Sequence, residues 1–233
     1  MAELAAPGAT DRQTKRLCDV SASVTGMSGA GIMLMSGEIP IGSVCTTNTV
    51  SALIEELQYA LGEGPCVDAY RSDAVVFEAD LAGRAGARWP AFSGPAIAAG
   101  VRAVFGFPLR VGAVRLGALN LYRDQPGPLS DDQYADALVM ADIAAEAVLL
   151  MQANAPPGQL DTELGASANF QTVVHQATGM IAVQLDTTVA QALIRLRAYA
   201  FGNDQPLTDV AKAVVARTLR LDDSHDRCDS QLR

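Results

Sequence analysis

The chain has 233 residues, of which 49% are apolar, and its formal net charge is −9. This length allows one large or two small domains, and the composition is that of a globular protein with a sizeable core. The negative charge disfavours attraction of the whole protein to nucleic acid or to an anionic membrane. The charge is uneven, because residues 1–164 carry −9, residues 165–221 carry +2 and residues 222–233 carry −2.

Signals for targeting and for metal or disulfide chemistry are absent from the sequence. The N-terminus lacks the pattern of a signal peptide, and the most apolar stretch, residues 137–151, is too short to span a bilayer. The four cysteines, which form no CxxC pair, lie at positions 18, 45, 66 and 228. We therefore expect no membrane association, no metal site, no disulfide framework and a cytoplasmic location.

Helical and strand patterns alternate over residues 1–152. Apolar positions at helical spacing predict a helix over residues 51–61, which ends at Gly62. Ser130 is the predicted N-cap of the last helix of this region, residues 130–151. The predicted helices cover residues 11–25, 51–61, 87–100 and 130–151. The predicted strands cover residues 30–36, 39–47, 101–111 and 115–123, and residues 62–77 hold a turn, a short helix and a further strand. This order predicts an α+β domain, with one antiparallel sheet flanked by helices.

The same region resembles a GAF domain, the small-molecule sensing fold, over residues 15–150. The resemblance is carried by the segments LGEGPCVDAY, RWPAF, VRAVFGFPL, RLGALNLYR and PGPLSDDQ, and it is strongest to GAF domains of actinobacterial regulators. It implies a GAF sensor domain over residues 1–152, with a ligand enclosed against the sheet. The ligand itself is not identified by the sequence.

The residues of this region argue against two kinds of function, binding of a histidine-ligated haem and catalysis. Both histidines, His175 and His225, lie outside it, which argues against a histidine-ligated haem. No nucleophile–base set is present, so we expect no enzymatic activity. Cys66, Trp89 and Phe92 are candidates for the ligand pocket; the alternative is that all three are buried core residues.

The C-terminal part begins after a predicted linker, residues 153–168, that is rich in Pro and Gly. Three helices are predicted in residues 169–221, and residues 222–233 form an acidic tail. The helices cover residues 169–185, 188–201 and 206–217, with Asn169 and either Thr187 or Thr188 as caps. Such a small three-helix bundle has a thin core, so small residues that let helices approach closely matter.

Residues 175–219 resemble an ANTAR domain, a three-helix module that binds RNA. The resemblance rests on the spacing of Ala177, Gly179, Met180, Ala192, Leu196, Arg197, Tyr199, Ala200, Leu207, Val210, Ala211 and Val214. It implies binding of nascent RNA with paired hairpins whose loops have six nucleotides, promotion of transcription antitermination, and a homodimer. We expect Gly179, in mid-helix, to let another helix approach; the alternative is a kink.

The predicted RNA contacts are polar positions on the three helices. They are Arg197, His175, Gln176, Thr178, Lys212 and Arg217. Arg197 matches the family motif, whereas Thr178 replaces a lysine found in many ANTAR domains. For the basic residues the alternative is an ordinary solvated helix face. Tyr199 either stacks on a base or packs in the core.

The last predicted helix of the first domain offers a surface for a second copy of the chain. A stripe of Tyr134, Leu138, Ala141, Ala145 and Val148 predicts a dimer seam, or else a helix face packed on the sheet. We expect a signal-responsive regulator with RNA hairpins, a second copy, and a small molecule or signalling protein as partners. The alternatives are a DNA-binding regulator and a protein-interaction adaptor.

Overall fold

The computed structural model describes residues 9–37, 39–83, 88–153 and 169–221. The chain divides into two compact units, Met1–Ala168 and Asn169–Arg233. Residues 154–168 and 222–233, which hold the predicted linker and tail, lie outside the described residues, as does the side chain of Asn169.

The elements of the first unit follow the predicted order closely. The helices are α1 (Ala9–Thr25), α2 (Thr49–Leu61), α3 (Pro65–Ser72), α4 (Pro90–Ala98) and α5 (Asp131–Ala153). The strands are β1 (Gly29–Ser36), β2 (Ile39–Thr46), β3 (Val76–Glu78), β4 (Ala103–Val111) and β5 (Val114–Arg123). The predicted caps are confirmed as well, because Ser130 Oγ accepts from Gln133 N–H at 3.2 Å and Gly62 ends α2 with a φ of 68°.

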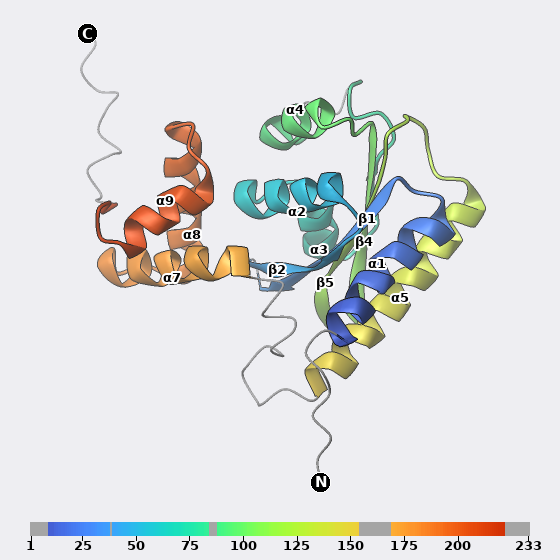
Figure 1. Cartoon of the computed structure of the whole chain (residues 1–233), viewed down its shortest axis with the longest axis horizontal. Coiled ribbons are helices and arrows are strands. Elements are labelled where there is room, and N and C mark those ends of the chain that lie inside the picture. Colours follow the sequence, from blue (N-terminus) through green and yellow to red (C-terminus); the bar gives the residue numbers. More distant parts are fainter. Residues whose placement is uncertain (1–8, 38, 84–87, 154–168, 222–233) are drawn as a thin grey trace. The chain divides into compact units, whose positions relative to one another are not determined.

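The five strands form one antiparallel sheet in the order β2-β1-β5-β4-β3. Helices α1 and α5 cover one face, and α2, α3 and α4 lie over the other (Figure 1). Alternation along β4 sends Phe105 and Phe107 into the core under α1 and α5, whereas Val104 joins the core on the opposite face. The predicted α+β architecture is therefore confirmed for this unit.

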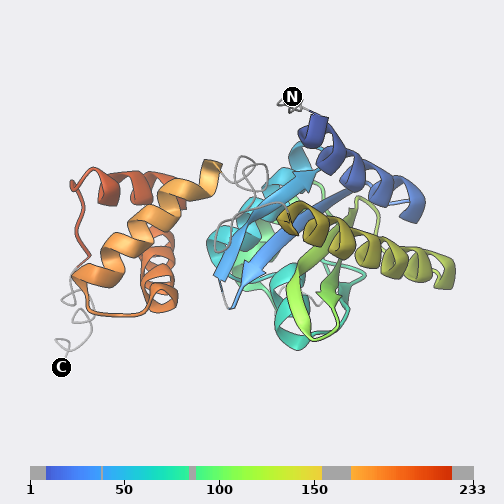
Figure 2. The same cartoon turned by 90° about the horizontal axis from the view of Figure 1, so that it is seen from below.

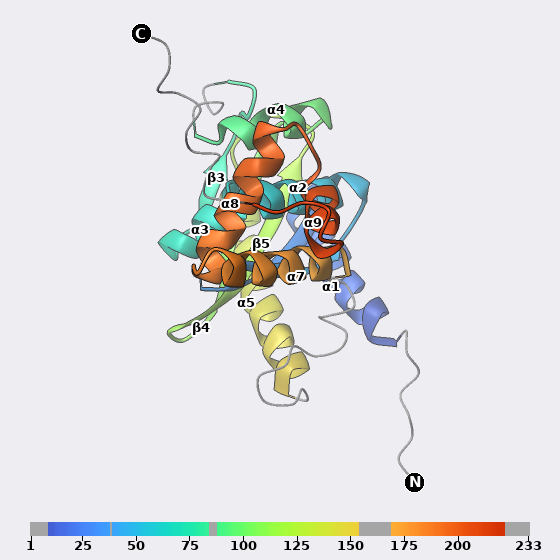
Figure 3. The same ribbon diagram turned by 90° about the vertical axis from the view of Figure 1, so that its left-hand side faces the viewer.

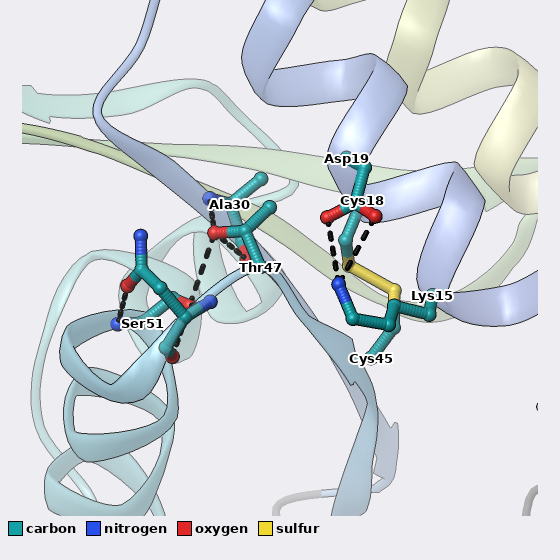
Figure 4. A network of polar contacts seen from close by, with 8 residues as sticks. Lys15, Cys18, Asp19, Ala30, Cys45, Thr47 and Ser51 are labelled. Carbon is teal, nitrogen blue, oxygen red and sulfur yellow. Dashed lines mark hydrogen bonds and ion pairs between the residues drawn. A yellow bond between two sulfur atoms is a disulfide. The ribbon is translucent and has the colours of Figure 1, made fainter.

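A disulfide links α1 to β2. Cys18 and Cys45 are bonded, with their Cα atoms 6.0 Å apart, although 27 positions separate them in sequence (Figure 4). Our expectation of no disulfide is wrong. The spacing of the cysteines in the sequence does not predict this bond, because only the packing of α1 over β2 brings Cys18 and Cys45 into one buried cluster. The cytoplasmic location, which rested partly on that expectation, stays a prediction.

The predicted seam on α5 is mostly core. Ala141, Ala145 and Val148 are 3% exposed or less and belong to the cluster beneath α1 and α5. Tyr134 and Leu138, at 40% exposure each, remain accessible. The alternative, a helix face packed inward, thus holds for three of the five positions. Figure 2 shows α1 and α5 running side by side along one side of this unit.

The second unit contains α7 (Asn169–Gln184), α8 (Val189–Gly202) and α9 (Leu207–Val215) (Figure 3). Thr188 caps α8 by accepting from Gln191 N–H at 3.2 Å, which decides between the two predicted caps. Small and branched residues fill the space between the helices. The buried set includes Val174, Ala177, Ile181, Ala192, Leu193, Leu196, Ala200, Leu207, Val210, Ala211 and Val214.

Candidate functional site

A buried polar pair lies between α2 and the sheet. Asn120 Nδ2 donates to Glu55 Oε1 at 3.2 Å, and the two residues are 1% and 3% exposed. Gly31 on β1 makes room for the carboxyl, because a Cβ there would lie 2.6 Å from Glu55 Oε1. Asn120 faces this side because it alternates with Leu119 and Leu121, which pack on the opposite face.

Burial raises the pKa of Glu55 from 4.5 to about 8, although the Asn120 hydrogen bond lowers it in part. Glu55 is therefore mainly protonated at neutral pH. A carboxylate would leave Glu55 Oε2 and Asn120 Oδ1 both without a hydrogen-bond partner. Protonation removes the buried negative charge and makes Oε2 a hydrogen-bond donor, so the neutral acid suits this site better than the anion.

The thiol of Cys66 lies beside this pair. Gln58 Oε1 accepts from the Cys66 N–H at 2.7 Å, and Cys66 is 1% exposed. Burial, and then the charge of Glu55, raise the pKa of the Cys66 thiol, while a side-chain hydrogen bond between Gln58 and the thiol lowers it. A buried thiol with a raised pKa is a weak nucleophile, so Cys66 serves packing rather than reaction chemistry.

Trp89 and Phe92 pack in the same core cluster as Cys66. Their ring centroids are 6.0 Å apart in an edge-to-face arrangement, and both rings are buried. Trp89 Nε1 donates to Asp68 Oδ2 at 3.0 Å, which satisfies the indole. The structure thus brings the three predicted pocket residues together within a packed core. Glu55 and Asn120 were not among the residues predicted from the sequence, although an Asn in the middle of an apolar strand is a signal for a buried polar partner.

A surface groove crosses the second unit and has a volume of about 730 Å³. We call it the Gly179 groove. It is lined by Gln176, Gly179, Met180, Val183, Gln184, Val214, Arg217, Leu219 and Arg220. Gln184 Nε2 donates to the Leu221 carbonyl at 2.9 Å and so holds the segment after α9 against α7. Among these described lining residues, none is acidic.

The comparisons with known proteins concern the first unit. A family model described as GAF domain matches residues 13–148, which is more than half of the chain. The chain belongs to the GAF domain family. Its first unit is a GAF signal-sensing domain, as the sequence resemblance implied. A search of the curated proteins finds no match.

Several solved structures are similar to the GAF domain. One is the GAF domain/HD domain protein from Geobacter sulfurreducens, with 16% identity over 65% of this chain and 100% of that chain and a TM-score of 0.48. Another is the second GAF domain of DevS from Mycobacterium smegmatis, with 18% identity, coverage of 61% and 96%, and a TM-score of 0.45. A third is the type II free methionine-R-sulfoxide reductase from Thermoplasma acidophilum, with 16% identity, coverage of 58% and 89%, and a TM-score of 0.45.

The predicted RNA contacts are dispersed over the second unit. Gln176 and Arg217 are exposed and line the Gly179 groove. His175 and Arg197 are half-buried, on α7 and α8. Lys212 is exposed and pairs with Asp209 at 3.1 Å. The structure therefore brings two of the six residues to one concave site.

Thr178 is placed differently from the prediction. It is 1% exposed, and its hydroxyl donates to the Val174 carbonyl at 2.6 Å within the same helix. A side chain so enclosed does not reach an RNA at the surface. Thr178 and its neighbour Ala177 face the core, which leaves Gly179 and Met180 at the edge of the groove.

Gly179 also differs from the prediction. A Cβ at this position would meet nothing within 4 Å, so no helix approaches closely there. The expectation that Gly179 serves helix packing is wrong, whereas Ala177, Ala192, Ala200 and Ala211 are buried between the helices. Gly in mid-helix costs about 1 kcal/mol relative to Ala. Packing does not account for that cost.

Within the part of the chain that the structure describes, no group of three His, Cys, Asp or Glu side chains is arranged to hold a metal ion. None of the helices in this part is long and apolar enough to cross a membrane.

Proposed function

We propose that this protein is a non-enzymatic, signal-responsive regulator that binds RNA. Its GAF domain senses a small molecule or a signalling protein. Its second unit is an ANTAR domain that binds paired hairpins with six-nucleotide loops and promotes transcription antitermination. Binding of the signal shifts an equilibrium between RNA-competent and occluded arrangements. A signal that leaves RNA affinity unchanged would count against this last step.

The Gly179 groove is the observation that carries the RNA proposal. Gln176 and Arg217, predicted from sequence as RNA contacts, meet there, and Arg220 adds a second exposed guanidinium. Loops of RNA present unstacked bases, which proteins read at their edges or stack on Arg planes. Phosphates attract Arg and Lys. A concave site with two arginines and no acid among its described lining residues suits such a loop.

The exposed side of α8 favours RNA over duplex DNA. A helix that reads the major groove presents polar side chains to base edges. The exposed residues of α8 are Val189, Gln191, Ile194, Arg195, Ala198, Phe201 and Gly202. Only Gln191 and Arg195 among them carry base-reading groups, so this helix is a poor recognition helix.

A second copy of the chain is the partner that we propose for the outer side of α1 and α5. Val20, Ile143 and Leu150 are exposed there, at 38%, 46% and 70%. They line an apolar groove of about 450 Å³ between the two helices. Two hairpins in one RNA call for two binding modules, and exposed apolar patches on soluble domains mark interaction sites. Both considerations support a homodimer.

The RNA proposal is tested with the full chain and a fluorescent RNA that carries two hairpins. Arg217→Ala and Arg197→Ala are compared with Arg110→Ala, which removes an exposed arginine of the GAF domain. We expect hairpin affinity to fall with added salt, with a log–log slope smaller by about 0.7–0.9 for each lost phosphate contact. Arg110→Ala should match the wild type. Equal competition by duplex DNA would favour the DNA-binding alternative, and no RNA affinity at low salt would favour an adaptor.

A further inference from the structure

The Gly179 groove contains a glycine that no packing contact explains. Gly179 weakens α7, yet a methyl group at this position would point into open space. Arg217, which lines the groove after α9, has a φ of 60° because it ends that helix, and the Thr218 N–H donates to the Ala213 carbonyl at 2.9 Å in the C-terminal cap. An unfavourable residue without a packing reason is expected at a functional site, so Gly179 points to a ligand in the groove.

The lining chemistry identifies the class of ligand. Arg217 and Arg220 supply positive charge at the rim, and Gln176 adds an exposed amide that both donates and accepts. Met180 and the 86% exposed Val183 supply apolar surface on the α7 wall. A ligand with a flat, polar-edged ring and an anionic group matches all of these features. A nucleotide has both parts.

We propose that the Gly179 groove is a base pocket, which takes one unstacked nucleotide of an RNA hairpin loop. The base lies over Gly179, where the missing Cβ leaves room, and packs against Met180 and Val183. The phosphate of that nucleotide meets Arg217 and Arg220. This proposal rests on the proposed RNA-binding function and adds to it the site and the single nucleotide that is read.

Gly179→Ala is the decisive variant, because it adds one methyl group to the pocket. Gly202→Ala is its matched control, since Gly202 is also helical, also has open space around its Cα and does not line the groove. Both substitutions favour the helix, so neither should lower the melting temperature. We expect Gly179→Ala to raise the Kd for the two-hairpin RNA about tenfold or more, while Gly202→Ala stays within about twofold.

The bound nucleotide is identified with RNAs in which each loop position in turn is made abasic. At the position whose base enters the pocket, the wild type should lose about tenfold or more in affinity. Gly179→Ala should lose nothing further there, because its pocket is already blocked. At every other loop position, the loss of affinity caused by the abasic site should be the same for the wild type and for Gly179→Ala.

The outcomes separate the two proposals. If the wild type binds hairpin RNA but Gly179→Ala binds equally well, the base pocket is wrong and the RNA-binding function stands. The same conclusion follows if Gly179→Ala weakens binding but no abasic position couples to it. If the full chain shows no hairpin affinity at low salt, the RNA-binding function fails, and the base pocket fails with it.

Discussion

Replacing Glu55 with glutamine should make the GAF domain more stable, and increasingly so as the pH rises. The Glu55 pKa is raised from 4.5 to about 8 by burial. The unfolded chain therefore releases this proton near pH 4.5, whereas the folded protein keeps it until about pH 8. Raising the pH through this range favours unfolding, while below and above it Glu55 has no effect on the pH dependence.

The size of the change in the free energy of unfolding follows from the difference between the two pKa values. At about 1.4 kcal/mol per pKa unit, the loss of stability between pH 4.5 and pH 8 is about 5 kcal/mol for a fully buried group. Glutamine does not ionise. Its uncharged amide keeps an oxygen that can accept from Asn120 Nδ2 and carries N–H donors where the neutral acid carries an O–H. The stability difference between Glu55→Gln and the wild type should therefore grow by several kcal/mol from about pH 5 to about pH 8.5.

Urea unfolding followed by circular dichroism at both pH values measures this difference. Glu146→Gln, which replaces an exposed glutamate on α5, is the matched control and should show little change. A carbonyl stretch of a protonated acid in the infrared spectrum, present in the wild type at pH 6 and missing in Glu55→Gln, gives an independent reading. A pH-independent difference between the two proteins would refute the reasoning, because it would mean that Glu55 is ionised in the folded state.

Two further predictions concern stability and assembly. Replacing Cys18 and Cys45 with serine should lower the free energy of unfolding by about 3–4 kcal/mol, because the disulfide closes a loop with a sequence separation of 27; urea titrations with and without reductant measure this, and an unchanged midpoint would contradict it. Ile143→Asp should convert a dimer to a monomer in light scattering, whereas Val114→Asp, at an exposed valine of the β4–β5 hairpin, should not; a dimer that survives Ile143→Asp would place the interface elsewhere.

Local signals explain why the elements were predictable. The caps Ser130 and Thr188 act on backbone groups within three residues, so the sequence predicts the start of α5 at Ser130 and the start of α8 to within one residue, at Thr187 or Thr188. The apolar runs over residues 101–111 and 115–123 likewise predict the strands β4 and β5. Long-range contacts were not predictable in this way. The Cys18–Cys45 bond and the Glu55–Asn120 pair join residues 27 and 65 positions apart, and only the packing of helices on the sheet brings them together.

The candidate site was predicted in part for the same reason. Polar positions on the predicted helices placed Gln176 and Arg217 among the RNA contacts, but they also included Thr178, whose side chain turns into the core of its own unit. Residues 176, 178 and 179 are neighbours in sequence and point in different directions around a helix. The period of α7 was known, but the orientation of its buried face was fixed only by packing against α8 and α9.

Glu55 in the first unit and Gly179 in the second unit both reduce the stability of the unit that contains them. Each has a near-isosteric replacement, Gln or Ala, that the surrounding space accepts. Features that break a local rule without a packing reason are expected at functional sites. If Glu55→Gln and Gly179→Ala both stabilise the protein and both leave RNA binding and its response to the signal intact, that expectation fails for this protein. If one of them removes the response and the other the binding, then sensing and RNA recognition lie in different units, as the proposed regulator requires.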